Sequence, residues 1–209
     1  MDKKYAIFDM DGTLIDSMVY WKRLAGEFLE SKGVSEIPGD ILEKIKPMTM
    51  SESAALFIRE FALDGTPESV AAEMNDMMDM HYRQDIPLKN GVRDYLEALH
   101  RQGVGMCVAS ATAEHLMDAC LRRLNVRSYF QFLLSCEAVG AGKHRPDVYF
   151  AAAERLGATP AETAVYEDAQ YAAETAKKAG FYVIGVYDES AERSWPAITA
   201  LADACIRQF

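Results

Sequence analysis

The 209-residue chain is predicted to have an α/β fold: a three-layer α/β/α core with a parallel sheet, plus a small all-helical second domain. Short apolar runs alternate with helical patterns along most of the chain, which is typical of parallel strands joined by crossover helices. The runs lack polar–apolar alternation, so both faces of the sheet are expected to be covered. After the first run, about seventy residues carry helical patterns alone, which is too long for a simple connection.

The core domain is predicted to comprise residues 1–16 and 88–209. Its first strand is the run "KYAIF", and further strands are predicted at residues 104–110, 130–135, 163–167 and 181–187. Helical patterns separate these runs and lie at residues 91–103, 113–125, 146–157 and 171–180. Several of them end in Gly or Asn, which commonly terminate helices in the left-handed conformation.

Residues 17–87 are predicted to form the helical domain. Its segments lie at residues 17–33, 40–46, 51–63 and 67–84. Because the insertion directly follows the first strand, we expect it to lie over the carboxyl end of that strand as a cap. This position makes it a candidate for substrate selection.

Composition excludes several classes of partner. With 22 basic and 32 acidic residues the net charge is −10, which argues against nucleic acid or an anionic membrane as the main partner. No run approaches about 18 apolar residues, and no leader pattern is seen. The four cysteines are scattered without CxxC pairing, so neither disulfides nor a zinc site is expected. We expect a cytoplasmic protein. The sequence has no heptad pattern that would require a partner chain, so we expect a monomer.

Polar residues gather where the predicted strands end. Ligands of open parallel sheets bind beyond the carboxyl ends of the strands. Six side chains are expected at that edge: Asp9, Asp11, Ser110, Lys143, Glu167 and Asp168.

Such a concentration of carboxylates requires a cation or protonation, because two unit charges about 4 Å apart repel by about 4 kcal/mol at an effective dielectric of 20. An all-oxygen set without His or Cys favours Mg²⁺ over zinc or copper. A carboxylate beside a metal-bound phosphate can act as the nucleophile, and a second acid can transfer protons. Lys143 and Ser110 would then hold the phosphoryl oxygens. The chemistry predicted is phosphoryl transfer.

Simpler interpretations explain single residues but not the set. A calcium loop needs Gly at its sixth position and Glu at its twelfth, whereas here Gly12 is fourth and Tyr20 twelfth from Asp9. A hairpin turn at Asp11-Gly12 leaves Asp9 unexplained. Taken alone, Lys143 would be interpreted as a surface lysine, and Glu167 and Asp168 would be interpreted as part of a solvated turn.

These residues resemble the motifs of the haloacid dehalogenase-like hydrolases, most of which are magnesium-dependent phosphatases with a Rossmann-like core. "FDMDGTLIDS" resembles the first motif, which implies that Asp9 is the nucleophile and Asp11 the acid/base. Ser110 resembles the second motif, "GKHRPDVY" with Lys143 the third, and "YEDAQYAAETAKKAG" the fourth. The motifs occur in family order over residues 5–180, and a helical cap between the first two marks one subfamily.

The resemblance also implies a set of binding residues. The implied metal is Mg²⁺, held by Asp9, Asp11 (through its backbone carbonyl), Asp168 and Glu167, directly or through water. The implied phosphate-binding residues are Ser110, Ala111, Lys143, Gly12 and Thr13. Separately from the resemblance, Trp21, Thr49 and Met50 are candidate substrate residues, because they lie on cap segments expected to face Asp9; for Trp21 a place in the core of the cap is an equal alternative.

The chain departs from the family pattern at two places. The fourth motif has Ala169 and Ala172 where Ser and Gly are usual. In the cap loop "KPMTMSES", Pro47 and Met50 occupy positions where sugar-phosphate mutases carry glycine and an arginine. The second departure favours hydrolysis over mutase activity.

The favoured function is a Mg²⁺-dependent phosphomonoester hydrolase that acts on a small phosphorylated metabolite through an aspartyl-phosphate intermediate. The alternatives are a β-phosphoglucomutase-like phosphomutase and a catalytically silent binding or regulatory protein. Dehalogenase and phosphonate-cleaving activities are disfavoured because those branches lack an acid at the position of Asp11. The sequence does not identify the metabolite.

Overall fold

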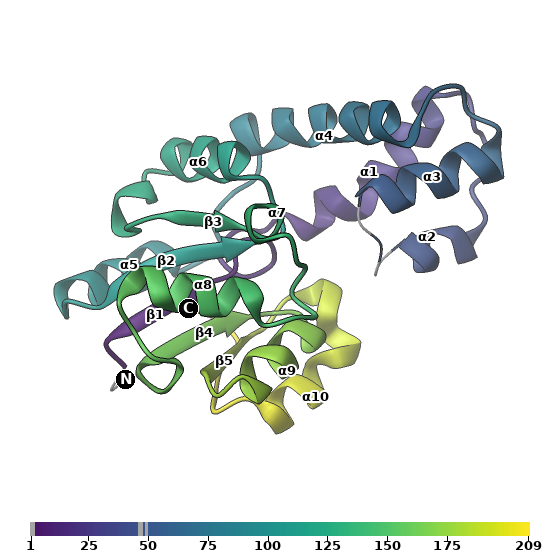
Figure 1. Cartoon of the computed structure of the whole chain (residues 1–209). Helices are drawn as coiled ribbons and strands as arrows, with labels where there is room; N and C mark the ends of the chain where they lie inside the picture. Colours follow the sequence, from purple (N-terminus) through teal and green to yellow (C-terminus); the bar gives the residue numbers. More distant parts are fainter. Residues whose placement is uncertain (1–2, 46–47, 49) are drawn as a thin grey trace. The chain divides into compact units, whose positions relative to one another are not determined.

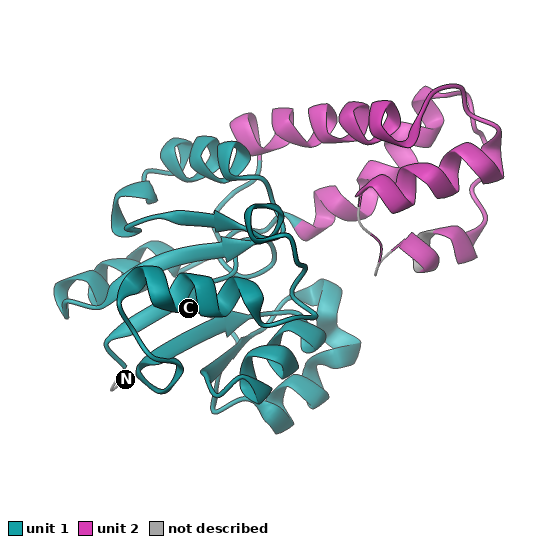
Figure 2. Cartoon of the chain, viewed as in Figure 1, with its two compact units in different colours: residues 1–17, 86–209 teal, residues 18–85 magenta. Residues whose placement is uncertain are grey.

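The computed structural model describes residues 3–45, 48 and 50–209. The chain divides into two compact units, a core unit of Met1–Ser17 and Ile86–Phe209 and a helical unit of Met18–Asp85 (Figures 1 and 2). In the described part of the chain, no helix combines the length and apolar character needed to cross a membrane.

The core unit is built on a parallel sheet. Within the described residues it has six strands in the order β3-β2-β1-β4-β5-β6. They are β1 (Tyr5–Phe8), β2 (Gly105–Ser110), β3 (Leu133–Ser135), β4 (Thr163–Glu167), β5 (Tyr182–Val186) and β6 (Ala204–Ile206). In register, Phe8 of β1 lies opposite Val108 of β2 and Tyr166 of β4. The carboxyl ends of β1, β2 and β4 therefore meet at one edge of the sheet.

Helices cover both faces of this sheet (Figure 1). The longer ones are α5 (Val92–Arg101), α6 (Glu114–Arg123), α8 (Asp147–Leu156) and α9 (Gln170–Lys178), and the shorter ones are α7 (Cys136–Val139) and α10 (Trp195–Leu201). Three 3₁₀ turns lie between a helix and a strand in the described part of the chain: η1 (Arg127–Tyr129), η2 (Pro160–Glu162) and η3 (Glu189–Ser194). The predicted α/β class is confirmed.

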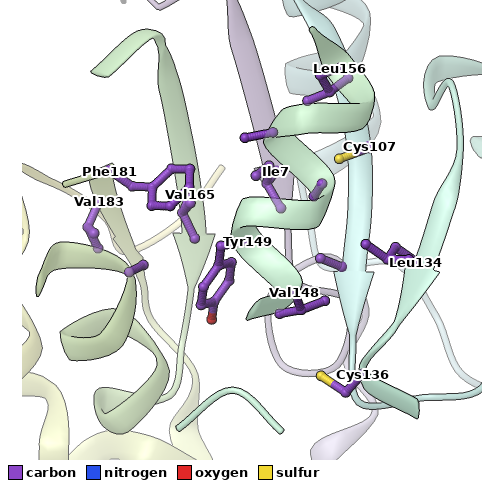
Figure 3. Packing of buried hydrophobic residues seen from close by; sticks show 14 of the residues in the cluster. Ile7, Cys107, Leu134, Cys136, Val148, Tyr149, Leu156, Val165, Phe181 and Val183 are labelled. Carbon is purple, nitrogen blue, oxygen red and sulfur yellow. The ribbon is translucent and has the colours of Figure 1, made fainter. Parts of the chain in front are cut away.

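Strand alternation divides the core side chains between the two faces. Ile7 and Val165 face α8 and α9, where they pack in one buried cluster with Tyr149 and Phe181 (Figure 3). The opposite face carries Phe8 and Tyr166, whose rings stack at 4.1 Å. Tyr95 of α5 packs edge-on against Tyr166 on that face. The strands are covered on both sides, which explains their uninterrupted apolar sequences.

Two parts of the sheet differ from the prediction. The strand predicted at residues 130–135 begins only at Leu133, because Phe130 still donates its backbone N–H to Arg127 of η1. Phe130 and Phe132 are both buried, and Phe132 already accepts a hydrogen bond from the backbone of Val108 in β2. The edge strand β6 was not predicted.

The helical unit contains α1 (Met18–Ser31), α2 (Gly39–Ile45), α3 (Met50–Phe61) and α4 (Pro67–Gln84). Thr66 caps α4: its hydroxyl accepts from the backbone of Ser69, whose hydroxyl accepts from the backbone of Thr66, a capping box that satisfies two free donors. Phe28 of α1 stacks on Phe57 of α3 with ring centroids 6.3 Å apart. Both rings belong to the unit's own buried core.

Candidate active site

Asp9 follows β1 directly and remains in the sheet's hydrogen-bond ladder. Its backbone N–H donates to the carbonyl of Tyr166 at 3.0 Å, so its backbone is fixed relative to β4. The chain then turns sharply at Gly12, whose φ of 79° lies in the left-handed region that glycine adopts at little cost. The N–H of Gly12 donates to the carbonyl of Ile15 at 3.0 Å, which closes the turn.

Lys143 joins two buried carboxylates. Its ammonium donates to Asp9 Oδ1 and, at 2.7 Å, to Glu167 Oε1. All three residues are buried, and Glu167 is only 1% exposed. Burial by itself would lower the pKa of Lys143, but the carboxylates of Asp9 and Glu167 outweigh it and raise this pKa. Lys143 is therefore a permanent cation between them.

Negative charge nevertheless exceeds what Lys143 balances. Asp9, Glu167 and Asp168 each offer a carboxylate oxygen, and these oxygens lie within 4.8 Å of one another. Burial raises the pKa of Asp9 to about 7 against the opposing effect of Lys143, and the nearby Glu167 adds to the rise. Burial and the charge of Asp9 raise the pKa of Asp168 well above its usual range. Burial disfavours the charged form of both carboxyl groups, and Lys143 offsets this effect only in part.

This donor set fits a magnesium ion. Mg²⁺ prefers oxygen ligands and is usually bound by one or two carboxylates together with waters and substrate phosphate. The three acidic side chains supply oxygens alone, and a divalent cation among them would offset the charge that Lys143 leaves unbalanced. Thr13 lies beside this group, because its hydroxyl donates to Asp168 Oδ1 at 3.1 Å.

Asp11 accepts hydrogen bonds from two hydroxyls. Ser17 donates to its Oδ1 and Thr112 to its Oδ2, both at 2.6 Å. Thr112 is positioned by its own backbone N–H, which donates to Ser110 Oγ at 3.2 Å at the end of β2. Ala111 lies between them and is exposed. The carboxylate of Asp11 thus has a fixed orientation next to the loop that follows β2.

The remaining candidate residues are the three predicted to contact substrate from the cap. Trp21 and Met50 belong to the helical unit, where Trp21 Nε1 donates to the hydroxyl of Tyr82 at 3.1 Å. Thr49 lies outside the described residues, as does Pro47. Their proposed contact with substrate stays a prediction.

Three hydroxyl groups that bind the acidic side chains at this edge were not predicted from the sequence. Ser17 and Thr112 bind Asp11, and Tyr149 donates to Glu167 Oε1 at 2.7 Å. A tyrosine on the buried face of a helix normally needs a hydrogen-bond partner, so Tyr149 did carry a signal. Thr112 and Ser17 carried none, because their partner is defined only by the folded loop.

Comparison with known proteins identifies the family. The family model described as haloacid dehalogenase-like hydrolase matches residues 6–186. Hexitol phosphatase B of Escherichia coli K12 is 30% identical over 168 residues, which cover 78% of this chain and 74% of the relative. Beta-phosphoglucomutase of Bacillus subtilis is 27% identical over 198 residues, which cover 88% and 81% respectively.

A solved structure agrees in fold. CbbY from Rhodobacter sphaeroides, in complex with xylulose-(1,5)bisphosphate, superimposes with a TM-score of 0.83 at 21% identity and covers 99% of this chain and 94% of its own. At that identity the likeness concerns the fold. The family model, in contrast, spans most of the sequence and includes every acidic residue described above. The chain belongs to the haloacid dehalogenase-like hydrolases.

Proposed function

We propose that this protein is a Mg²⁺-dependent phosphatase that hydrolyses a phosphomonoester of a small metabolite through an aspartyl-phosphate intermediate. The observation that carries the proposal is the buried group of Asp9, Lys143, Glu167 and Asp168 next to Asp11. Family membership supports the reaction class. The names of the relatives, a hexitol phosphatase and a phosphoglucomutase, favour phosphorylated sugars or sugar alcohols as substrates.

In the first step, a carboxylate oxygen of Asp9 attacks phosphorus and forms an acyl phosphate. The bond from phosphorus to the leaving oxygen breaks, and Asp11 donates the proton that this oxygen needs. The two hydroxyls that donate to Asp11 orient its ionised form, which is the form that accepts the proton from water in the second step. Lys143 contacts Asp9 and would offset charge on the phosphoryl oxygens.

In the second step, water attacks the acyl phosphate and gives its proton to Asp11. The bond between phosphorus and the Asp9 oxygen breaks, inorganic phosphate leaves, and Asp9 is restored as a carboxylate. The phosphoryl oxygens would be bound through hydroxyl and backbone N–H groups of Ser110, Ala111, Gly12 and Thr13.

Asp9, Asp168, Glu167 and the backbone carbonyl of Asp11 would hold the Mg²⁺ ion. When bound, the ion neutralises phosphoryl charge and keeps the phosphate oriented for in-line attack.

The helical unit would act as the cap, with Trp21, Thr49 and Met50 as candidate contacts to the leaving group. None of the four cysteines forms a disulfide in the described part of the chain, which fits a cytoplasmic protein. They are Cys107, Cys120, Cys136 and Cys205.

Phosphate release from a panel of sugar and sugar-alcohol phosphates tests this function. We expect release that requires Mg²⁺ and is abolished by Asp9→Asn, which keeps the side-chain shape but removes the nucleophile. Turnover that survives Asp9→Asn would contradict the mechanism. Metal binding without turnover of any substrate would favour a binding or regulatory protein.

A phosphomutase is the second candidate, favoured by the likeness to beta-phosphoglucomutase. It predicts an isomerised sugar phosphate rather than free phosphate when a monophosphate is supplied with a catalytic bisphosphate. Met50, at a position where mutases resembling this chain carry a charged residue, favours hydrolysis. Product analysis by ³¹P nuclear magnetic resonance separates the two reactions.

A further inference from the structure

Tyr149 connects the hydrophobic core to the acidic edge of the sheet. Its side chain is completely buried, and its ring packs beside Val165 and Phe181 between α8 and the sheet (Figure 3). The hydroxyl points toward the carboxyl end of the strands (Figure 3) and donates to Glu167 Oε1 at 2.7 Å. A phenylalanine would fill the same space in the core, so the hydroxyl serves the acidic edge and not the packing.

The same oxygen of Glu167 receives a second donor. Lys143 also donates to Oε1, at 2.7 Å, and neither donor uses Oε2. With donors from α8 and from the loop before α8 converging on one oxygen, the carboxylate cannot rotate without breaking both bonds. Glu167 is therefore held in one orientation, with Oε2 free of these two donors.

We propose that Tyr149 is a positioning residue for magnesium: by fixing Oε1 of Glu167, it presents Oε2 to the ion or to one of its waters. This inference rests on the proposed Mg²⁺-dependent function. Partners that orient metal ligands typically change metal affinity 10–100-fold when they are removed.

The competing explanation is a core tyrosine whose hydroxyl merely finds a partner. That explanation predicts that loss of the hydroxyl lowers stability and leaves magnesium binding unchanged. Tyr166 offers a matched control, because it is equally buried and its hydroxyl bonds Tyr95 at 2.9 Å on the opposite face of the sheet. Tyr166→Phe removes the same chemical group without touching Glu167.

Isothermal titration calorimetry with Mg²⁺ alone separates the two explanations. We expect Tyr149→Phe to raise the dissociation constant for magnesium about tenfold. Tyr166→Phe should leave this constant within about twofold of the wild-type value. In assays, Tyr149→Phe should raise the Mg²⁺ concentration for half-maximal activity while kcat at saturating Mg²⁺ changes little. In a Glu167→Gln background, Tyr149→Phe should have no further effect on binding, because the two residues act through one contact.

A wild-type dissociation constant in Tyr149→Phe would overturn the inference while leaving the proposed function intact. An equal loss in Tyr149→Phe and Tyr166→Phe would also overturn it, since this would indicate a general effect of destabilisation. Failure of the wild-type protein itself to bind Mg²⁺ would instead contradict the proposed function, and the inference with it. Urea unfolding of each variant in EDTA establishes that all are folded before titration.

Discussion

Lys143→Met should destabilise the metal-free protein far more than the loss of an ordinary ion pair. The substitution keeps most of the side-chain length and removes the charge, so it isolates electrostatics from cavity formation. Lys143 is 4% exposed and contacts both Asp9 and Glu167. Removing one partner of a buried ion pair typically costs about 3–5 kcal/mol, because the charge left behind is uncompensated.

The loss should depend on pH. Asp9 has a pKa raised by burial to about 7, so at pH 8 it is ionised and needs the cation, whereas at pH 6 it is largely protonated. We expect Lys143→Met to lose about 3–5 kcal/mol of unfolding free energy at pH 8 and less at pH 6. The opposite trend would refute this account of how charge is balanced at the site.

Urea unfolding in EDTA provides the assay, with Lys177→Met as the control. Lys177 pairs with Asp203 at 2.5 Å, but the two side chains are 40% and 27% exposed, and such surface pairs contribute about 0–1 kcal/mol. A Lys143→Met loss below about 1 kcal/mol at pH 8, equal to that of the control, would mean that the carboxylates are not charged in the folded protein.

Three further predictions follow from the same geometry. Because burial raises the pKa of Asp9 from 3.8 to about 7, the folded state retains a proton that the unfolded state releases over this range. The unfolding free energy of the metal-free protein should therefore fall as pH rises from 4 to 7 relative to Asp9→Asn; a parallel profile for the two proteins would contradict this. Thr112→Val removes one of the two hydroxyl donors to Asp11 and should lower kcat about tenfold, the effect of one hydrogen bond to a charged group, with KM nearly unchanged; an unaltered kcat would argue against the role of that bond. Gly12→Ala should cost about 1–2 kcal/mol in urea unfolding, because φ is 79° there. Gly26→Ala within α1, where an added Cβ would have no heavy atom within 4 Å, should be neutral or stabilising; equal effects of the two substitutions would contradict the backbone argument.

Much of the fold could be predicted because the buried strands carry a simple signal. β1, β2, β4 and β5 are covered on both faces, so their sequences are uninterrupted apolar runs. β6 carries no such signal, since Ala204 and Cys205 are exposed and the strand is defined by pairing with β5 alone. At β3 the apolar run is longer than the strand, because Phe130 is buried but still donates its backbone N–H to Arg127 of η1.

The acidic residues of the site could be placed from the sequence for a related reason. Strand ends fix where Asp9 and Asp168 lie, and parallel pairing brings them to one edge. The hydroxyls that orient Asp11 and Glu167 depend instead on loop conformation and on the rotation of α8 about its axis. No local pattern specifies that Thr112 contacts a residue 101 positions earlier.

The most direct test of the account is phosphate release from phosphorylated sugars and sugar alcohols, measured with and without Mg²⁺ for the wild-type protein and Asp9→Asn. We expect release in the wild type with Mg²⁺ and none in the other three conditions. Release that continues without the metal, or that persists in Asp9→Asn, would contradict the assignment of Asp9 as a nucleophile in a magnesium site.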